Sequence, residues 1–432
     1  MDLPSKKRLR RTKKLQCQLE KRIDFVDSVF SKELVLKVFS FLSSSDLAQC
    51  AVVSLRWSQM ASDEMLWKPL FMNQFEAQEN ITQKTTATRY GGSWKTKYRV
   101  HHNWLLGNHD IHDIVQYQDN TSPHQLQLMH DVLFISQQSS IDVYRTEGPV
   151  LLRQLQCTSC VTFLKLVEST HTHHLVAGDA NGGLTLWEIK GSSSMDLDIV
   201  EIATYATEQN KVISVGMNYP ILVTFTHNRK LSVFRLQNLT CSLIQCLQSP
   251  MDWSPMIMDI HAIANQRWKV VLCFGSSHHD TVGMQEIVLN LHRVISSRQG
   301  FCPLSFPCHS LSDQITSMVY DSPYLITAHT NNTMKQYIVS NRGSQLDIRF
   351  QQTLYGHTCR VDALAITKHK LISGDRSGIY IWNLATKQHI MTLRMYQDQS
   401  SLNELPDAHM ETLGFDEDKI VAVVQNDKDG FI

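Results

Sequence analysis

The first part of the fold is decided by residues 27 to 75, DSVFSKELVLKVFSFLSSSDLAQCAVVSLRWSQMASDEMLWKPLFMNQF. Its apolar residues recur at helical spacing, first in a run that contains Leu34, Val38 and Leu42. Ser31 precedes this run, where a serine can act as the N-cap of a helix. The pattern predicts one short amphipathic helix at the start of the stretch.

Two further helical runs follow a polar break at residues 43–46. The second run has Leu47 and Val53 on its apolar face, and the third contains Trp57 and leads to Leu66 and Trp67. Helices this short are marginal in water, so they must pack against each other or against a partner. A unit of this size cannot bury all of its apolar surface, and we expect part of it to face another protein.

The order of residues in this stretch resembles the F-box family. The matching positions are Glu33-Leu34, Phe39-x-x-Leu42, Asp46-Leu47, Val53-x-x-Arg56-Trp57 and Asp63-x-x-Leu66-Trp67. One position departs from the family, which usually has Leu-Pro where this chain has Phe30-Ser31. The alternative interpretation is an ordinary three-helix fragment that belongs to a larger core.

The resemblance implies a partner and a set of contact residues. An F-box docks on the Skp adaptor of a cullin-based ubiquitin ligase. The residues expected to bind the adaptor are Phe30, Leu34, Val38, Leu42, Leu47, Val53, Trp57, Leu66 and Trp67.

Composition indicates a soluble, multidomain, intracellular protein. The chain has 432 residues, of which 42% are hydrophobic and 19% charged, and its 41 basic residues balance 41 acidic ones. Because the charges balance, we expect no specific nucleic acid as partner. No apolar run approaches the roughly 18 residues of a membrane span, so we expect no membrane. The ten cysteines are expected to be reduced. The run of basic residues within residues 1–25 predicts a disordered arm, which is either a nuclear-import signal or a solvated tail.

A repeat fills the second part of the chain. In each unit, a leucine followed by an apolar residue precedes an aromatic residue by 11 or 12 positions. The five pairs are Leu133 with Tyr144, Leu175 with Trp187, Leu222 with Phe234, Leu325 with Tyr337, and Leu371 with Trp382. Apolar and polar residues alternate before the aromatic residue, as in a strand with one buried face. Turn residues lie between the leucine and the aromatic residue, so each unit is predicted to contain a hairpin.

The spacing of the units predicts a β-propeller. Neighbouring units start 42 to 47 residues apart, the length of a four-stranded blade. The longer interval from Leu222 to Leu325 holds a degenerate blade with strands at residues 270–274 and 287–289. Ile420, answered by Phe431, starts a seventh unit. We expect residues 104–110 to supply its outer strand and close the ring.

The unit near the C-terminus resembles the WD-repeat family, with Gly356-His357, Ser373-Gly374-Asp375 and Trp382-Asn383. The predicted fold class is therefore α plus all-β: a three-helix F-box at residues 26–75, a linker at 76–92, and a seven-bladed WD-like propeller at 93–432. This architecture resembles the substrate receptors of Skp-cullin-F-box ubiquitin ligases.

The sequence gives little support for a metal site, a redox site or an enzyme active site. Cys157-x-x-Cys160 has redox or zinc spacing without a second pair, and the histidines of residues 171–174 and 278–279 fall in predicted loops, where solvated side chains are commoner than metal ligands. No phosphate loop or nucleophile elbow is present, so we expect neither a cofactor nor an active site. Four basic residues of the blade loops are candidates for binding a phosphorylated or acidic target segment, the alternative being a solvated rim: Lys211, Arg229, Arg360 and Arg376.

These observations favour a noncatalytic substrate receptor, cytoplasmic, nuclear or both, whose F-box binds the Skp adaptor and through it a cullin, and whose propeller binds a protein target. The alternative is a propeller scaffold that assembles stable partners. A propeller hydrolase would need converging carboxylates or histidines in the central channel, and the sequence alone shows none.

Overall fold

The computed structural model describes residues 26, 29–79, 93–112, 125–148, 150–168, 172–191, 194–206, 210–237, 240–249, 255–276, 281–303, 314–343, 345–394, 408–416 and 418–426. The chain forms two compact units, residues 1–109 and residues 110–432. The basic arm and most of the linker lie outside the described residues.

The first unit is helical, as the sequence predicts. Its helices are α2 (Lys32–Phe39), α3 (Ser44–Cys50), α4 (Leu55–Ala61), α5 (Glu64–Glu79) and α6 (Trp94–Leu106). The predicted polar break works as a capping box: Ser43 Oγ accepts from the backbone N–H of Asp46 at 3.2 Å, and the Asp46 carboxylate accepts from the N–H of Ser43 at 3.3 Å. Local sequence signals therefore set where these short helices begin.

Helix α6 corrects two of our expectations. We expected residues 104–110 to form an outer strand of the propeller and the propeller to begin at residue 93, but residues 94–106 are helical and belong to the first unit. Tyr98 packs against Trp67 and Phe75, with ring centroids 5.3 and 5.5 Å apart. Gly107, at φ 73°, ends the helix in the left-handed conformation that glycine adopts without strain. Helix α5 also runs to Glu79, past the predicted boundary at residue 75.

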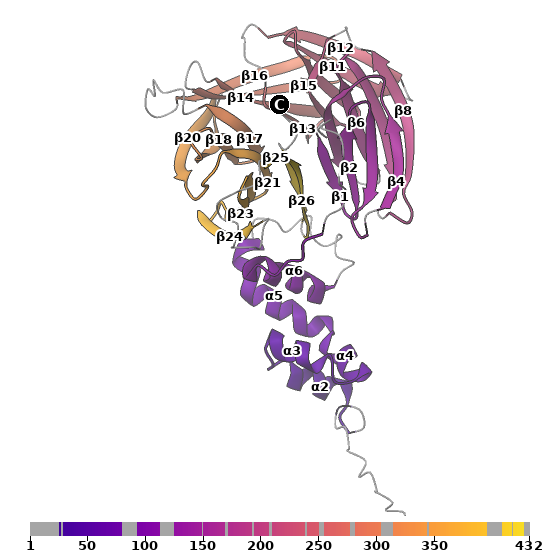
Figure 1. The fold of residues 1–432 in the computed structure, drawn as a ribbon, viewed down its shortest axis with the longest axis vertical. Helices are drawn as coiled ribbons and strands as arrows, with labels where there is room; N and C mark the ends of the chain where they lie inside the picture. The colour runs from indigo at the N-terminus through magenta and orange to yellow at the C-terminus, as the bar shows by residue number, and fades with distance from the viewer. Residues whose placement is uncertain are drawn as a thin grey trace, which may run out of the picture. The chain divides into compact units, whose positions relative to one another are not determined.

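The second unit is built from antiparallel sheets (Figure 1). Six sheets have four strands each: β1 (Leu126–Met129), β2 (Val132–Gln137), β3 (Ser140–Arg145) and β4 (Val150–Gln156); β5 (Val161–Glu168), β6 (His173–Asp179), β7 (Gly183–Lys190) and β8 (Asp198–Ala206); β9 (Val212–Asn218), β10 (Ile221–Thr226), β11 (Lys230–Gln237) and β12 (Thr240–Gln248); β13 (Ile257–Ile263), β14 (Arg267–Ser276), β15 (Thr281–Asn290) and β16 (Val294–Pro303); β17 (Ile315–Asp321), β18 (Tyr324–His329), β19 (Met334–Arg342) and β20 (Gln345–Leu354); β21 (Val361–Thr367), β22 (Lys370–Asp375), β23 (Gly378–Asn383) and β24 (Gln388–Arg394). We call these sheets blades 1 to 6.

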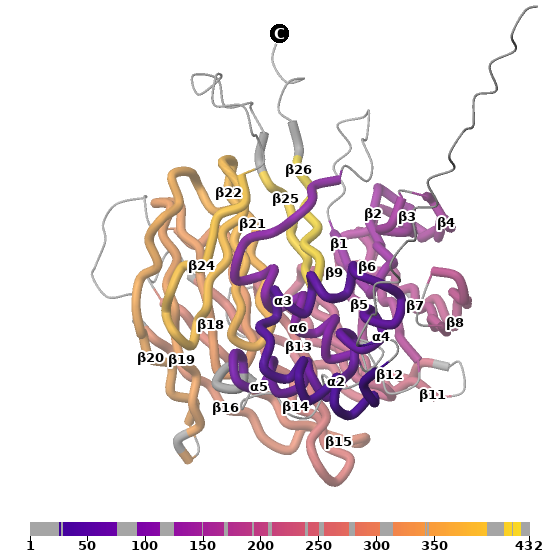
Figure 2. Tube along the Cα trace, turned by 90° about the horizontal axis from the view of Figure 1, so that it is seen from below, coloured from indigo at the N-terminus to yellow at the C-terminus, as the bar shows by residue number. Residues whose placement is uncertain are grey.

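A seventh sheet has two strands, β25 (Ala408–Phe415) and β26 (Ile420–Asn426). The prediction of seven blades is therefore wrong: the described residues form six four-stranded blades and this two-stranded sheet. Residues 104–106, where the outer strand of the last unit was expected to begin, lie in helix α6. Phe431, the predicted aromatic of the last unit, lies outside the described residues. Figure 2 shows β25 and β26 between blade 6 and blade 1, and contacts from β21 to β25 and from β25 to β1 close the ring of inner strands.

The predicted leucine and aromatic partners face each other across the second and third strands of their blades. The paired residues in the register are Leu133 and Tyr144, Leu175 and Trp187, Leu222 and Phe234, Leu325 and Tyr337, and Leu371 and Trp382. The degenerate blade follows the same plan, since Val270 pairs with Ile287. The hairpin prediction is therefore confirmed in each of these units.

Each of these pairs packs against the preceding sheet in the ring. Leu371 and Trp382 of blade 6, for example, lie in one cluster with Ile326 and Met334 of blade 5. Blade 1 has the seventh sheet before it, and there Leu133 and Tyr144 contact Val421 and Val423 of β26. Two strands are therefore enough to cover the pair of blade 1.

Glycines in two second strands let neighbouring blades approach closely. A Cβ on Gly178 of β6 would lie 2.6 Å from Cγ1 of Val212 at the start of β9. A Cβ on Gly374 of β22 would overlap the side chain of Met410 on β25. The space that a side chain would occupy is filled by the next inner strand.

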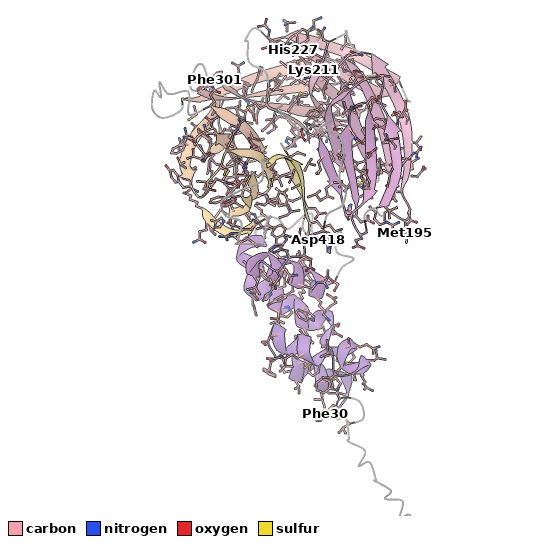
Figure 3. All side chains as sticks on the ribbon, in the orientation of Figure 1. Phe30, Met195, Lys211, His227, Phe301 and Asp418 are labelled. Atoms are coloured by element: carbon pink, nitrogen blue, oxygen red, sulfur yellow. The ribbon has the colours of Figure 1, made fainter. Side chains whose placement is uncertain are left out.

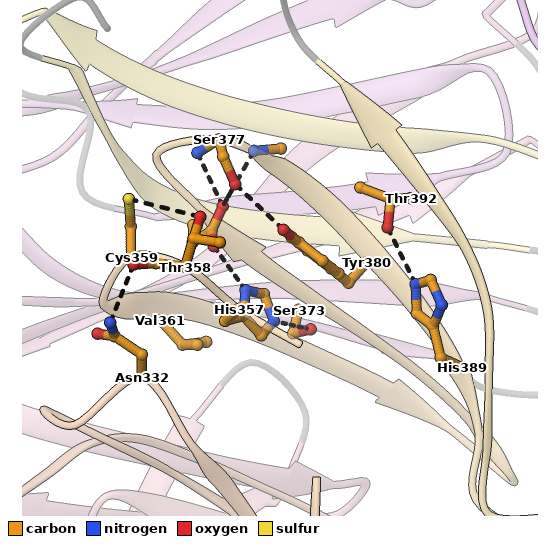
Figure 4. Close-up of polar contacts among 12 residues, drawn as sticks. Asn332, His357, Thr358, Cys359, Val361, Ser373, Ser377, Tyr380, His389 and Thr392 are labelled. Atoms are coloured by element: carbon orange, nitrogen blue, oxygen red, sulfur yellow. Dashed lines mark hydrogen bonds and ion pairs between the residues drawn. The ribbon is translucent and has the colours of Figure 1, made fainter. Parts of the chain in front are cut away.

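Blade 6 holds a buried polar network between its strands (Figure 4). His357 Nδ1 lies 2.8 Å from Asp375 Oδ2, and His357 Nε2 lies 2.7 Å from Ser373 Oγ. The indole N–H of Trp382 donates to the same Ser373 Oγ at 2.8 Å. Burial raises the pKa of Asp375, but hydrogen bonds from His357 and Ser377 outweigh it and leave the pKa below its ordinary value. A charged Asp375 therefore favours the tautomer in which His357 carries its proton on Nδ1.

Blade 4 buries a carboxylate between two cations. Glu286 is 2% exposed, and its carboxylate oxygens lie 3.0 Å from Lys269 Nζ and 2.9 Å from an Arg298 guanidinium nitrogen. Such a buried pair contributes little net stability, but removal of one partner leaves an uncompensated charge. The buried Glu286 therefore requires that Lys269 and Arg298 lie on the same face of the blade.

Replacement of Ser373 by Ala should lower the free energy of unfolding by about 2 kcal/mol, because the indole N–H of Trp382 and the ring of His357 lose a buried partner together. Urea unfolding of the full chain measures the change. Ser340→Ala, at an exposed serine of β19, is the matched control. Equal effects of the two substitutions would show that the network adds nothing to stability.

Asp416, in the turn between β25 and β26, predicts a pH-dependent stability. Burial, followed by the neighbouring Asp418, raises its pKa to about 6. A raised pKa means that stability is full below the unfolded value of about 4 and is lost as the pH rises through about 6. Asp416→Asn stays neutral and keeps the acceptor for the backbone N–H groups of Asp418 and Lys419.

We therefore expect Asp416→Asn to be more stable than the natural chain by about 1–2 kcal/mol at pH 8 and almost equal to it at pH 4. Chemical unfolding at the two pH values tests this expectation, with Asp198→Asn as an exposed control. A stability difference that stays constant between the two pH values would contradict it.

Candidate functional site

Helix α2 is apolar on two faces. Val35 and Phe39 are each 3% exposed and lie in the core of the helical unit. Leu34 and Val38, one turn apart, point the other way and are 55% and 59% exposed. A surface helix normally has one apolar stripe, so the second stripe indicates a surface made for a partner.

Further apolar residues continue this exposed row beyond both ends of α2. Phe30, before the helix, is 43% exposed, and Phe41, after it, is 79% exposed. Figure 3 shows the side chain of Phe30 on the outside of the helical unit. We define the α2 row as Phe30, Leu34, Val38 and Phe41.

A second exposed apolar set lies in the turn between α3 and α4 and at the first residue of α4. Val52, Val53 and Leu55 are 84%, 60% and 86% exposed. Ser54, the N-cap of α4, accepts from the backbone N–H of Trp57 at 3.3 Å and so fixes the turn. The turn thus presents its apolar side chains from an ordered backbone.

Three of the predicted adaptor-binding residues are not on the surface. Leu47, Leu66 and Trp67 are 1%, 4% and 4% exposed and lie in the core of the helical unit. The indole N–H of Trp67 donates to the carbonyl of Ala61 at 2.7 Å, which ties α5 to the end of α4. These residues support the exposed surface from below.

Leu42 and Trp57 are half-buried against the same core, and the rings of Trp57 and Phe39 lie 5.4 Å apart. The prediction therefore selected residues of both kinds and omitted Phe41, Val52 and Leu55. Helical period alone does not separate the two faces of α2, since both are apolar.

Ser31 occupies the N-cap position of α2, but its side chain makes no capping hydrogen bond to the helix backbone. The pKa of the exposed Glu33 is lowered, first by a hydrogen bond from its own backbone N–H and then by one from Ser31. Lys32 pairs with Asp63 at 3.1 Å and so connects α2 to the start of α5. The start of α2 is held by these contacts in place of the predicted cap.

The four basic residues predicted to bind a target divide between two blades. Lys211 and Arg229 flank blade 3, where the backbone N–H of His227 donates to the carbonyl of Lys211 at 2.9 Å (Figure 3). Arg360 and Arg376 belong to blade 6, and Arg360 forms a 2.8 Å ion pair with Asp362. Blades 4 and 5 separate the two pairs on one side of the ring.

The cysteine and histidine motifs sit in ordinary surroundings. Cys157 packs against the core of blades 1 and 2, and burial raises its pKa to about 12. Burial likewise lowers the pKa of His174, which stacks on Tyr219. Within the described ranges, no three His, Cys, Asp or Glu side chains converge as metal ligands would. His171, His278 and His279 lie outside those ranges.

None of the helices in the described part of the chain combines the length and the hydropathy that a bilayer span requires.

Two protein families match the chain. Residues 32–73 match the family described as F-box-like, and residues 149–426 match the family described as F-box protein pof12 beta-propeller. The WD-repeat resemblance rests on blade 6, and it stays a prediction because the matched family is defined by F-box propellers.

One curated protein is similar over a short segment, and one solved structure is similar at low sequence identity. F-box protein dre-1 of Caenorhabditis elegans is 33% identical over 81 residues, which are 16% of this chain and 9% of that protein. The chain thus spans less than a tenth of that relative's length. The crystal structure of the computationally designed Ika8 protein is 14% identical, with a TM-score of 0.41 over 72% of this chain and 95% of that one.

The helical unit and the ring of sheets each agree with the family that matches their residues. The propeller match covers more than half of the chain, so the chain belongs to the F-box protein pof12 beta-propeller family.

Proposed function

We propose that this chain is the substrate-recognition subunit of a Skp-cullin-F-box ubiquitin ligase. The helical unit binds the Skp adaptor, the adaptor binds a cullin, and the propeller holds a target protein for ubiquitination. F-box domains bind the Skp adaptor, and residues 32–73 match that domain.

The α2 row is the observation that carries this proposal. Leu34 and Val38 of α2, with Phe30 just before it and Phe41 just after it, expose apolar side chains on a small unit that already has a full core. Burial of one such side chain in an interface contributes about 1.5–3 kcal/mol, so a few of them are enough for a stable complex. Val52, Val53 and Leu55 add apolar surface from the turn between α3 and α4.

Phe30-Ser31 replaces the Leu-Pro pair that the F-box family usually has. Phe30 provides an apolar side chain at the first position, and Ser31 leaves the second position exposed and polar. We infer that the adaptor contact depends more on Leu34, Val38 and Phe41 here than on the residues before the helix.

The ligase role requires no reactive group in this chain. A receptor that holds target and ubiquitin donor together raises their effective concentration, which accelerates transfer without a catalytic residue. F-box propeller proteins are typically noncatalytic adaptors, which agrees with this role.

Target binding by the four basic residues takes a more specific form in this proposal. Lys211 with Arg229 and Arg360 with Arg376 belong to separate blades, so they would meet two acidic or phosphorylated groups rather than one. Arg360 would first have to release Asp362, its partner at 2.8 Å.

Replacement of Leu34 by Asp should weaken binding to the Skp adaptor at least about tenfold, because a charge would enter an apolar interface. Capture of adaptor and cullin by the full chain measures the effect. Leu243→Asp in β12 is the matched control, since Leu243 is 57% exposed and Leu34 is 55% exposed. If Leu34→Asp retains the adaptor, or if the natural chain never binds it, the propeller scaffold becomes the better account.

Leu47→Ala and Leu34→Ala should separate support from contact. Leu47 is 1% exposed, so its truncation should lower the stability of the helical unit by about 2–4 kcal/mol and weaken adaptor binding only through unfolding. Leu34→Ala should leave stability within about 0.5 kcal/mol and still weaken binding. Thermal unfolding and adaptor titration of both variants test the assignment, and equal stability losses would contradict it.

A further inference from the structure

The centre of the propeller contains a cavity of about 400 Å³. Its walls come from the inner strands β1, β5, β13, β17, β21 and β25. Tyr320, Thr367 and Phe415 lie at or next to the ends of their inner strands, so the cavity reaches the face opposite the loops that carry Lys211 and Arg360. The volume is within the range of small-ligand sites.

An ion pair lies in the wall of this cavity. Lys165 Nζ donates to Asp259 Oδ1 at 2.7 Å and to the carbonyl of Met258 at 3.1 Å. The backbone N–H of Ile260 donates to the same Asp259 Oδ1 at 2.9 Å. Among the described residues, the one contact of Asp259 Oδ2 is a long one of 3.5 Å with His261 Nε2, so this carboxylate oxygen retains capacity to accept.

The carboxylate of Asp259 has a second carboxylate, that of Asp321, close to it. Burial and the nearby charge of Asp259 raise the pKa of Asp321, on the neighbouring inner strand. Lys165 lowers the pKa of Asp259 in spite of the burial of that carboxyl. Lys165 forms its ion pair with Asp259, while Asp321 accepts a hydrogen bond from the backbone N–H of Lys368. The half-exposed His261 and the side chain of Lys368 are the other titratable groups near the two carboxylates.

The rest of the wall is mixed, with polar groups on Gln127, Tyr320 and Thr367 and several apolar side chains. Ile257, Ile366 and Leu413 line the cavity together with the ring of Phe415. This combination suits a side chain with an apolar stem and a charged head, because the stem can pack against the wall while the head reaches a carboxylate.

We propose that the channel cavity binds a basic side chain, a lysine ammonium or an arginine guanidinium, carried by a segment of the target protein. The head group binds Asp259 Oδ2, and the stem lies against Leu413 and Phe415. An anion is disfavoured because, bound to the remaining N–H of Lys165, it would lie beside the carboxylate of Asp259, whose charge also reaches Asp321. The inference deepens the target-binding half of the proposed function and rests on it.

The test is a titration of the full chain with Nα-acetyl-arginine methylamide, followed by ligand-observed NMR. The citrulline counterpart replaces the charged guanidinium by a neutral group of the same shape and should bind much more weakly. Asp259→Asn should weaken the arginine probe about tenfold, because the charged acceptor is lost. Lys165→Met should instead strengthen its binding, because the competing cation is removed.

Asp347→Asn is the matched control, since Asp347 also forms an ion pair, at 2.8 Å with Arg349, but on the outer strand β20. Thermal unfolding of each variant confirms that it is folded. No saturable binding of the arginine probe, equal binding of the citrulline probe, or an unchanged affinity in Asp259→Asn would overturn the proposal. Preferential binding of Nα-acetyl-aspartate methylamide, lost in Lys165→Met, would overturn it in favour of an anion site.

Adaptor binding measured on the same preparation keeps the two proposals distinguishable. A chain that binds the adaptor but not the arginine probe retains the ligase role and loses the channel site. A chain that binds the probe but not the adaptor retains the channel site and loses the ligase role.

Discussion

The ring depends on one cross-strand pair in each four-stranded blade, packed against the preceding sheet. Five blades have a leucine on the second strand and an aromatic residue on the third, and blade 4 has Val270 and Ile287. Leu371 is fully buried and Trp382 is 4% exposed. Because side chains alternate along a strand, a shift of one residue would turn the pair to the other face of its sheet. The pair therefore sets the register of its blade and the contact between blades at once. It also explains how a two-stranded sheet closes the ring, since Val421 and Val423 cover Leu133 and Tyr144.

This constraint made much of the propeller predictable from the sequence. A pair that must meet across a hairpin leaves two apolar signals at a nearly constant interval, and each of the five intervals corresponds to an observed register pair. The number of complete blades was not predictable in this way, because outer strands carry a weaker pattern. The outer strand predicted at residues 104–110 is wrong because the sequence before it favours a helix. Ser93 is the N-cap of α6, Tyr98 and Val100 are buried, and Gly107 ends the helix.

The candidate surface shows a different limit of sequence analysis. Helical period places Leu34 and Val38 on one face of α2 and Val35 and Phe39 on the other, but it does not say which face the rest of the unit covers. That choice is made by α4 and α5, whose Trp57, Trp67 and Phe71 pack on the inner face. The channel cavity was beyond sequence analysis for a similar reason. Lys165 and Asp259 are 94 residues apart, and only the succession of blades brings them to 2.7 Å.

The helical unit separates the residues that fold it from those left to bind. Leu47, Leu66 and Trp67 complete a core that includes α6, so the unit can fold before any partner arrives. In the proposed function, an adaptor would meet an α2 row that is already ordered, which limits the entropy cost of association. A disordered segment would have to be ordered during binding. Preformed order suits a receptor, because transfer to a target depends on how well the positions of both partners are fixed.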